Sequence, residues 1–582
     1  MLLNPTSTSA PTTLVWHRRD LRLHDNSLYT DLDGHDRPSI SVFCFDPMEF
    51  CRRPSCANSA WAATHIGPHG ALALLDAVIE LREALRARGG ELLVRSGDPA
   101  SVLPQLVRQF SVTEVRWHEE PGVTEAAAAA RVSSAVRAVR CRVRTDFGRA
   151  LYHPDDLPQP EEWFGLANPR QKLQPRRQSR RKASGNVGNE KDERKRSPGR
   201  VGMDRERFAD MPRVMGDWRR AARARAKPRA PLPPPTRLTQ PREVLAGEAG
   251  EMPSFEQLMQ PTLQQSSSGA KPLFGLSDGV VASIVANAAK QHTSRRDTPW
   301  DTPWSCLSES AAIDRLTCFI GNGQAAVADR SLADVADANS SKLSVALALG
   351  VLSPRQVHAA AEGGGGEAAW LSSHMEMRDF FLYSAVAAGA HLFRREGTPI
   401  AAGRAALTDW RAPADADDEW RRWATGTTGL PLVDAAMREL IATGYCSNRV
   451  RQNAASLLTK DLCIDWRAGA ELFQWLLADH DVAANWGNWQ YFGGVGADPK
   501  QRHFRTISQA ARYDPTGAYV RKWLTELRDV DDAEALLRPF DLLPERWPLV
   551  PIVDTATQLT WQDAARLEES GCVLETVKIS VE

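Results

Sequence analysis

The sequence of 582 residues lacks the features of several common protein classes. Its nine cysteines include no CxxC pair and no paired spacing, which argues against a zinc site and against a secreted disulfide framework. No apolar run reaches the roughly 20 residues that cross a bilayer, and the N-terminus lacks the apolar core of a signal peptide. These absences predict an intracellular protein without a membrane segment or a bound metal, with nucleus, cytoplasm and organelle all open.

A dinucleotide fingerprint is also missing, because no GxGxxG follows the first apolar strand and an NAD or FAD pyrophosphate site there is unsupported. The first part of the chain nevertheless alternates short apolar runs, closed by turn residues, with helical stretches such as 69–90. Strands that alternate with helices predict a doubly wound parallel sheet. The expected strands lie within residues 12–26, 39–47, 90–99 and 113–121.

Charge is balanced over the whole chain, with 72 basic and 72 acidic residues, but it is segregated along the sequence. Residues 170–229 contain 21 basic and 7 acidic residues, so this segment carries +14 and the remainder −14. The segment 154–310 is rich in Arg, Ser, Pro and Gly. A segment of this composition buries too little apolar surface to fold. A solvated linker explains the charge better than nucleic-acid docking, which stays open as the alternative. The sequence therefore predicts a basic, low-complexity and mostly disordered insertion.

After residue 311 the chain has helical patterns. The segment 427–448 has Thr before its apolar run, an early Pro431 and an exit at Gly444, and two further amphipathic segments follow it. The predicted organisation is an α/β domain at 12–153, a linker at 154–310, a helical domain at 311–540 and a C-terminal extension at 541–582.

Two carboxylates, the amide of Asn485 and two tryptophans occur within eleven residues of the sequence DHDVAANWGNWQ, which begins at Asp479. On a helix, Asp481, Asn485 and Trp489 are four residues apart and share one face. Two buried carboxylates repel each other unless cations or hydrogen-bond donors satisfy them. Arg451 is the expected partner of Asp479, and the imide N–H of a bound ring would satisfy Asp481. The simpler alternative is a helix cap, a salt bridge and a tryptophan core.

The order of motifs through 426–527 closely resembles the flavin-binding domain of the photolyase and cryptochrome family, most of all its DASH branch. These motifs are TGLPLVDAAMREL, SNRVRQN, DHDVAANWGNWQY, GVGADP and YDPTGAYVRKWL. WHRRDLRLHDN and FGRALYHPDDLP resemble the two ends of that family's antenna domain. The resemblance implies a monomer with an α/β, Rossmann-like antenna domain and an all-α domain that binds FAD non-covalently.

The resemblance assigns contacts with FAD to ten residues. The hydroxyls of the NSSKLS segment would meet the pyrophosphate at a helix start, Asp481 would lie near the isoalloxazine imide and ribityl region, and Asn485 would face flavin N5. The cofactor-binding residues implied in this way are Ser340, Ser341, Leu343, Ser344, Arg378, Asn448, Arg451, Asp479, Asp481 and Asn485.

Three tryptophans match the family's chain that passes electrons from the surface to photoexcited flavin, namely Trp489, Trp466 and Trp410. Because the sequence has 18 tryptophans, some must simply belong to a core, and core packing stays a strong alternative for any one of the three. The resemblance also implies an antenna chromophore of the 5,10-methenyltetrahydrofolate kind, for which Glu120 matches the contacting carboxylate.

Three positions depart from the family pattern. The lesion-contacting glutamate falls on His374, the lesion-stacking tryptophan on Met377 and a tyrosine that contacts the flavin phosphates on Val327. A change from carboxylate to imidazole alters charge and hydrogen bonding, and a change from Trp to Met removes a stacking face for a flipped base. His374 is either a donor to a substrate, and then catalytic, or an ordinary histidine.

Three functions follow from the resemblance and its departures. The first is a deoxyribodipyrimidine photolyase that uses blue light and reduced flavin to split cyclobutane pyrimidine dimers in single-stranded or looped DNA. The second, favoured by His374, Met377 and Val327, is a blue-light or redox receptor without repair, with the basic insertion serving a signalling partner or localisation. The third, supported by Val327 alone, is a scaffold without flavin.

Overall fold

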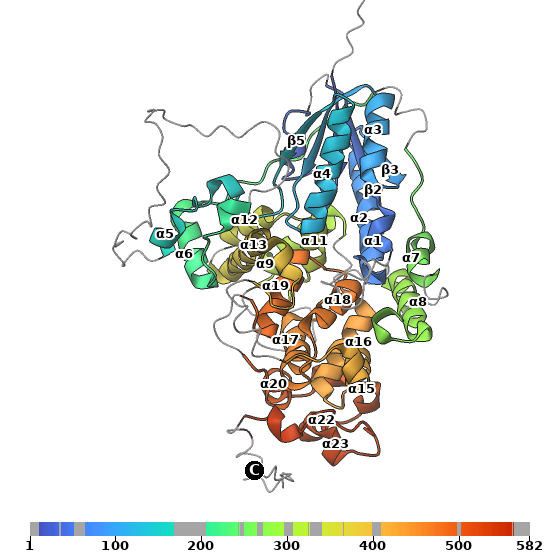
Figure 1. Ribbon diagram of the computed structural model, residues 1–582, viewed down its shortest axis with the longest axis vertical. Helices are drawn as coiled ribbons and strands as arrows, with labels where there is room; N and C mark the ends of the chain where they lie inside the picture. The colour runs from blue at the N-terminus through green and yellow to red at the C-terminus, as the bar shows by residue number, and fades with distance from the viewer. Residues whose placement is uncertain are drawn as a thin grey trace, which may run out of the picture.

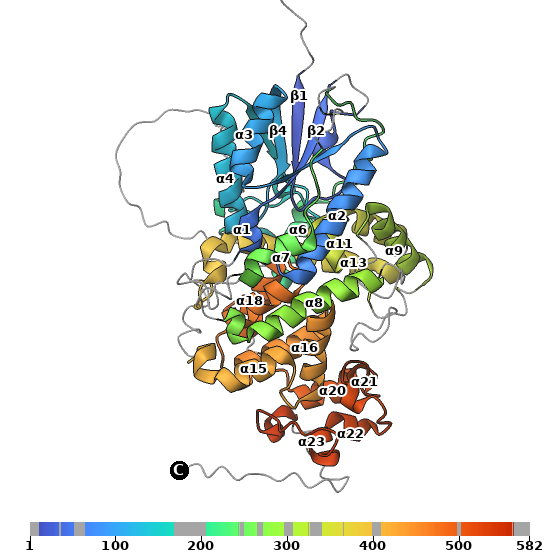
Figure 2. The same cartoon turned by 90° about the vertical axis from the view of Figure 1, so that its right-hand side faces the viewer.

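The computed structural model shows a sheet-containing part and a larger helical part (Figures 1 and 2). The residues that it describes are 11–33, 37–51, 65–167, 205–241, 244, 249–264, 272–295, 307–323, 325, 340–364, 366–398, 409–496, 502–560 and 563. Val327, on which one of the expected departures depends, lies outside them. Within them, no helix combines the length and the apolar character needed to cross a membrane.

The N-terminal part is built on a five-stranded parallel sheet with the strand order β3-β2-β1-β4-β5. This order confirms the predicted doubly wound architecture. Every residue of β1 and β2 is buried, as expected for parallel strands that are covered on both faces. The strands are β1 (Thr12–His17), β2 (Ser39–Phe45), β3 (Leu92–Ser96), β4 (Val112–His118) and β5 (Arg142–Asp146).

Helices cover the two faces of the sheet differently. On one face, α3 (Pro99–Gln109) and α4 (Val123–Ala138) enclose a separate apolar core with the inward side chains of the strands. On the other face, α2 (Pro68–Arg86) packs into an apolar core that continues into the helical part. Figures 1 and 2 show the sheet above the helices, with α2 running down toward them. The shared core fixes the two parts against each other.

The described part of the expected disordered insertion is folded, so the prediction of disorder is wrong there. It contains α5 (Trp163–Ala167), α6 (Met215–Arg225), α7 (Phe255–Gln264) and α8 (Asp278–Arg295), whereas residues 168–204 lie outside the described chain. In α6, Trp218 is fully buried together with two alanines. A few apolar residues at helical spacing are enough to dock an otherwise polar helix on a larger core.

Most arginines of α6 are paired with carboxylates of the same molecule. Arg219 and Arg223 form ion pairs of 2.9 and 2.6 Å with the buried Glu376. Arg220 pairs with a neighbouring aspartate at 3.0 Å, and Arg225 lies 3.7 Å from a glutamate near α5. For this part of the basic segment, ion pairs within the molecule account for the charge of these arginines.

The helical part begins after the linker and holds the segments predicted from the sequence. The amphipathic run expected at 427–448 forms a helix that ends at Gly444 in the left-handed conformation, with φ of 68°. The elements are α9 (Glu309–Gly321), α11 (Ser344–Leu349), α12 (Pro354–Gly363), α13 (Ala369–Ala388), α15 (Asp417–Thr425), α16 (Pro431–Thr443), α17 (Asn448–Ser456), α18 (Trp466–Leu476), α19 (Val482–Gly493), α20 (Thr506–Tyr513), α21 (Ala518–Trp523), α22 (Ala533–Leu537) and α23 (Pro539–Leu542).

The start of the expected C-terminal extension belongs to this helical part. Thr506 in α20 donates through its hydroxyl to the side-chain Oε1 of Gln558 at 2.6 Å, and the indole N–H of the buried Trp547 donates to the Gly429 carbonyl at 3.3 Å. Residues up to 560 therefore pack on the helical core, and the boundary at 540 is too early.

Candidate functional site

A cavity of about 520 Å³ lies between the start of α11, α13 and α17. Among the predicted residues, those that line it are Ser340, Ser341, Leu343, Ser344, His374, Asn448, Arg451 and Asp479. They come from four separate stretches of the helical part, which the fold brings together around one cavity.

Several polar atoms on the wall of this cavity have no partner within the protein. The hydroxyls of Ser344 and Ser447 and the Nε of Arg449 are buried without a hydrogen bond. Leaving such groups unmet costs about 1 to 3 kcal/mol each. Lys342, whose ammonium lies 4.4 Å from the centre of the Tyr445 ring, adds positive charge to the same wall. The wall therefore suits a polar, anionic ligand.

A smaller pocket of about 70 Å³ continues from this cavity, and Asn448, Arg451 and Asp479 line both. The predicted residues on its wall are Asn448, Arg451, Asp479, Asp481, Asn485 and Trp489. The expectation that the last three share one face is thereby confirmed.

The predicted ion pair between Arg451 and Asp479 is present. An Nη2 of Arg451 lies 2.9 and 3.2 Å from the two carboxylate oxygens, and its Nε donates to the Cys446 carbonyl at 2.7 Å. The Asp479 side chain is only 5% exposed. Burial lowers the pKa of Arg451, but the charge of Asp479 outweighs it and raises that pKa overall.

Asp481 is satisfied entirely by the protein. Its Oδ1 accepts hydrogen bonds of 3.0 Å from the Ala483 and Ala484 amides and so caps α19, while its Oδ2 accepts from Arg149 at 2.8 Å and Arg378 at 3.3 Å. A bound ring is therefore not needed to satisfy Asp481, because the helix cap of the alternative interpretation and the two guanidinium groups already supply donors. Burial raises the pKa of Asp481, but the two guanidinium groups prevail and lower it to about 2.

Asn485 lies one turn further along α19 with its side-chain orientation fixed. Its Nδ2 donates to the Ala470 carbonyl of α18 at 3.0 Å. The side-chain oxygen is therefore the atom left to accept a hydrogen bond at the pocket.

The three tryptophans of the expected electron chain are all buried, with exposures of 2%, 0% and 5% for Trp489, Trp466 and Trp410. Arg395 connects the last two: its carbonyl accepts from the Trp466 indole at 3.1 Å, and its guanidinium lies 5.9 Å from the Trp410 ring. Trp489 instead has an edge-on contact with Trp423, at 6.2 Å between ring centres.

Sequence reasoning missed two tryptophans beside this chain. Trp423 contacts Trp489 and stands 5.4 Å from Trp420 on the same helix, and Trp486 contacts Trp466 at 5.8 Å. The i, i+3 spacing in the sequence WRRW was the available signal for the first pair.

Close packing against Gly469 fixes the Trp489 ring. A Cβ at this position would lie 2.3 Å from one ring carbon. We expect Gly469→Ala to destabilise the protein by about 1 to 3 kcal/mol and to change the fluorescence of bound flavin, because the ring must move. Gly279→Ala on α8, where a Cβ meets nothing within 4 Å, is the matched control. Equal melting temperatures for the two variants would contradict the expectation.

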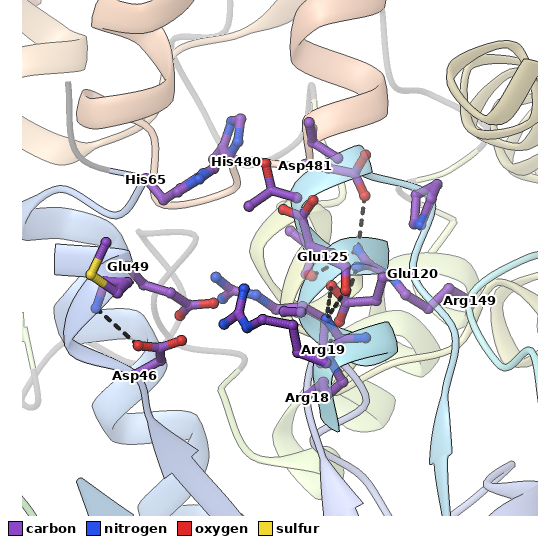
Figure 3. A pocket seen from close by; sticks show the side chains of 17 residues that line it. Arg18, Arg19, Asp46, Glu49, His65, Glu120, Glu125, Arg149, His480 and Asp481 are labelled. Atoms are coloured by element: carbon purple, nitrogen blue, oxygen red, sulfur yellow. Dashed lines mark hydrogen bonds and ion pairs between the residues drawn. The ribbon is translucent and has the colours of Figure 1, made fainter. Parts of the chain in front are cut away.

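A second cavity of about 490 Å³ lies where the sheet meets the helical part (Figure 3). Arg18 and Arg19 follow β1 and Glu120 follows β4, the two strands between which the strand order reverses. Open α/β sheets bind ligands outside the carboxyl ends of strands at such a point. Glu120 accepts a hydrogen bond of 3.1 Å from the Arg19 amide and lies 3.8 Å from the Arg18 guanidinium.

Comparison with known proteins gives the same two parts. Residues 13–172 match the family model described as DNA photolyase, and residues 370–559 match the model described as the FAD binding domain of DNA photolyase. Cryptochrome DASH of Gloeobacter violaceus is 32% identical over 92% of this chain and 90% of its own length. Cryptochrome DASH of Danio rerio is 32% identical over 88% of this chain and 83% of its own.

A solved structure shows the same fold over nearly the whole chain. The Synechocystis cryptochrome superposes with a TM-score of 0.71 at 26% identity, covering 96% of this chain and 99% of the other. The unmet donors of the large cavity fit the phosphates of FAD, and the adjoining pocket offers Asn485 and Trp489 to its ring. On sequence, fold and cavity together, the chain belongs to the photolyase and cryptochrome family, as an FAD-binding flavoprotein of the cryptochrome DASH type.

Proposed function

We propose that this chain uses FAD and blue light to split cyclobutane pyrimidine dimers in single-stranded or looped DNA. The observation that carries the proposal is the cavity wall, where exposed His374 and half-buried Trp370 lie beside the residues expected to hold FAD. The two rings pack edge-on with centres 5.1 Å apart. An aromatic face next to a ring that can donate hydrogen bonds suits an extrahelical base.

Bound and reduced FAD would supply a photoexcited electron that returns once the dimer has split, so the reaction has no net oxidation. The protein's part is to hold and orient the two reactants. Lys342 and Arg449 put positive charge on the cavity wall, which favours a polyanionic strand, and the His374 N–H can donate to a base carbonyl. A curated relative from Halobacterium salinarum that is 29% identical over 89% of this chain is named deoxyribodipyrimidine photo-lyase.

A second candidate function is a light or redox receptor that binds FAD without repair and signals to a protein partner. It is favoured by the exposed Met377, 40% accessible, where the family has a flat stacking ring, and by His374 in place of a carboxylate. Neither residue removes the FAD site itself. The receptor would therefore show a flavin spectrum and a light response but no dimer loss.

The deciding experiment illuminates the purified protein with blue light in the presence of a dimer-containing oligothymidine and follows recovery of absorbance at 260 nm. We expect slow dimer loss from the wild type. The double variant His374→Glu with Met377→Trp should bind the dimer about tenfold more tightly, because aromatic stacking contributes about 1 to 3 kcal/mol per base. A sample kept in the dark is the control. A flavin spectrum without dimer loss in either protein would select the receptor.

We also propose that the cavity at the sheet edge holds the second, antenna chromophore, of the methenyltetrahydrofolate kind. Its wall carries both signs of charge, from Arg18 and Arg131 and from Glu49 and Glu125. Burial raises the pKa of Glu49 to about 7, so this carboxyl can donate or accept a hydrogen bond near neutral pH. A heteroaromatic ring with both donors and acceptors matches such a wall.

A further inference from the structure

One carboxylate forms part of the wall of both the sheet-edge cavity and the small flavin pocket. Asp481 lines the cavity of about 490 Å³ and the pocket of about 70 Å³. Its Oδ1 is held by the first turn of α19, so only Oδ2 faces other side chains, and these are Arg149 and Arg378. The two sites are thus separated by a single charged group and its partners.

Arg149 reaches from this carboxylate into the sheet-edge cavity. Its Nη2 donates to Asp481 at 2.8 Å and to the Ala348 carbonyl at 3.1 Å, and its Nη1 lies 3.9 Å from Glu120. Figure 3 shows Arg149 and Glu120 side by side below Asp481, with a dashed line from Arg149 to Asp481. The guanidinium is 6% exposed, and its Nε has no hydrogen bond. The buried guanidinium of Arg149 therefore lies close to two carboxylates, Glu120 of the sheet-edge cavity and Asp481 of the flavin pocket.

The backbone that carries Arg149 is fixed by α13. Asp379 accepts from the Leu151 and Tyr152 amides at 3.0 and 2.8 Å, and Tyr383 donates to the Tyr152 carbonyl at 2.5 Å. This segment cannot shift without breaking buried hydrogen bonds. The side chain can therefore change its partners only by dividing its charge differently between Glu120 and Asp481.

We propose that Arg149 is a positioning residue that couples the two cavities, so that a group which engages Glu120 at the sheet edge alters binding and reduction of FAD next to Asp481. Charges about 4 Å apart in a largely buried site interact strongly, because little water screens them. A change at Glu120 therefore reaches Asp481 through Arg149. By linkage, bound FAD must change the affinity of the sheet-edge cavity for its ligand by the same factor as that ligand changes the affinity for FAD. The proposal rests on the FAD site and does not depend on dimer repair.

The test titrates FAD into the full-length apoprotein in the dark and measures the midpoint potential of the bound flavin. We expect Arg149→Met to weaken FAD binding about tenfold, within the usual range of coupling between sites, and to lower the midpoint potential, because the pocket loses a positive charge. Arg149→Lys should restore both values to near wild type. A purely structural role would change the melting temperature without moving the potential.

A double-mutant cycle with Glu120→Gln isolates the coupling. Glu120→Gln should raise the midpoint potential in the wild-type background, because Arg149 then neutralises Asp481 more completely, and should raise it less in the Arg149→Met background. Equal shifts in the two backgrounds would overturn the proposal. If Arg149→Met does not fold, Arg149→Gln removes the charge while keeping a donor, and the same comparison applies. The dark measurement separates this outcome from failure of the repair assay.

Discussion

Asp481→Ala is expected to lower the free energy of unfolding by about 3 kcal/mol and to yield protein without bound FAD. The change removes the cap of α19 and leaves Arg149 and Arg378, 6% and 12% exposed, without their common anion. Loss of one partner from a buried ion pair costs about 3 to 5 kcal/mol, and the remaining carbonyl contacts of both arginines place the expected value at the low end. Denaturant unfolding and the 450 nm to 280 nm absorbance ratio measure the two effects.

Asp481→Asn is the matched control because it keeps an oxygen for the cap and removes only the charge. The stability that the Asp481 charge contributes depends on pH. The pKa of Asp481 is lowered in the folded state to about 2, below the unfolded value of about 3.9. The charge therefore stabilises the wild type fully above about pH 4, and this contribution disappears as the pH falls through about 2. The stability gap between wild type and Asp481→Asn should narrow from pH 5 to pH 3, and a constant gap would contradict the assignment.

Arg451→Leu should have the second large effect, with a loss of about 3 kcal/mol and release of FAD. Asp479, whose side chain is 5% exposed, would keep its charge without the cation that now lies 2.9 Å away. The same substitution removes a cation from both the large cavity and the small pocket. Thermal unfolding with and without added FAD would show a lower melting temperature and a smaller shift on adding the ligand.

The matched control for this variant is Arg421→Leu on α15. Arg421 and Asp417 form an exposed pair at 3.0 Å, with side chains 50% and 59% accessible. Such helical surface pairs contribute about 0.3 to 0.5 kcal/mol. If Arg451→Leu is no more destabilising than Arg421→Leu and retains FAD, the pair with Asp479 does not support the site.

Local sequence patterns were sufficient to predict most strands and many helices of this molecule. Four of the five strands and the helices around Asp481 were predictable because their apolar residues recur at the period of the element and end in turn residues. Strand β5 was missed because it lies at the edge of the sheet, and its exposed Arg142 and half-exposed neighbours give no apolar run. Helix α6 was missed because its composition is mostly basic. Only a few apolar residues, above all Trp218, dock it on the core.

The site was predictable where one segment carries it and unpredictable where distant segments meet. Asp481, Asn485 and Trp489 follow from helical spacing, and the partner of Asp479 follows from charge complementarity. Arg149 could not be found this way, because it lies 332 residues from Asp481 and meets it only after the sheet has packed on the helices. A sequence records neither that approach nor the division of one guanidinium between two carboxylates.

The anchoring of residues 149–152 on α13 makes the flavin-holding region a poor candidate for separate expression or for chimaeras. A fragment starting at residue 307 would leave Asp379 and Glu376 buried without the amides and the phenol of Leu151 and Tyr152. Transplanting the sheet from a relative would meet the same obstacle unless its counterpart of Arg149 came with a compatible carboxylate. The two halves of this chain are thus constrained to change together.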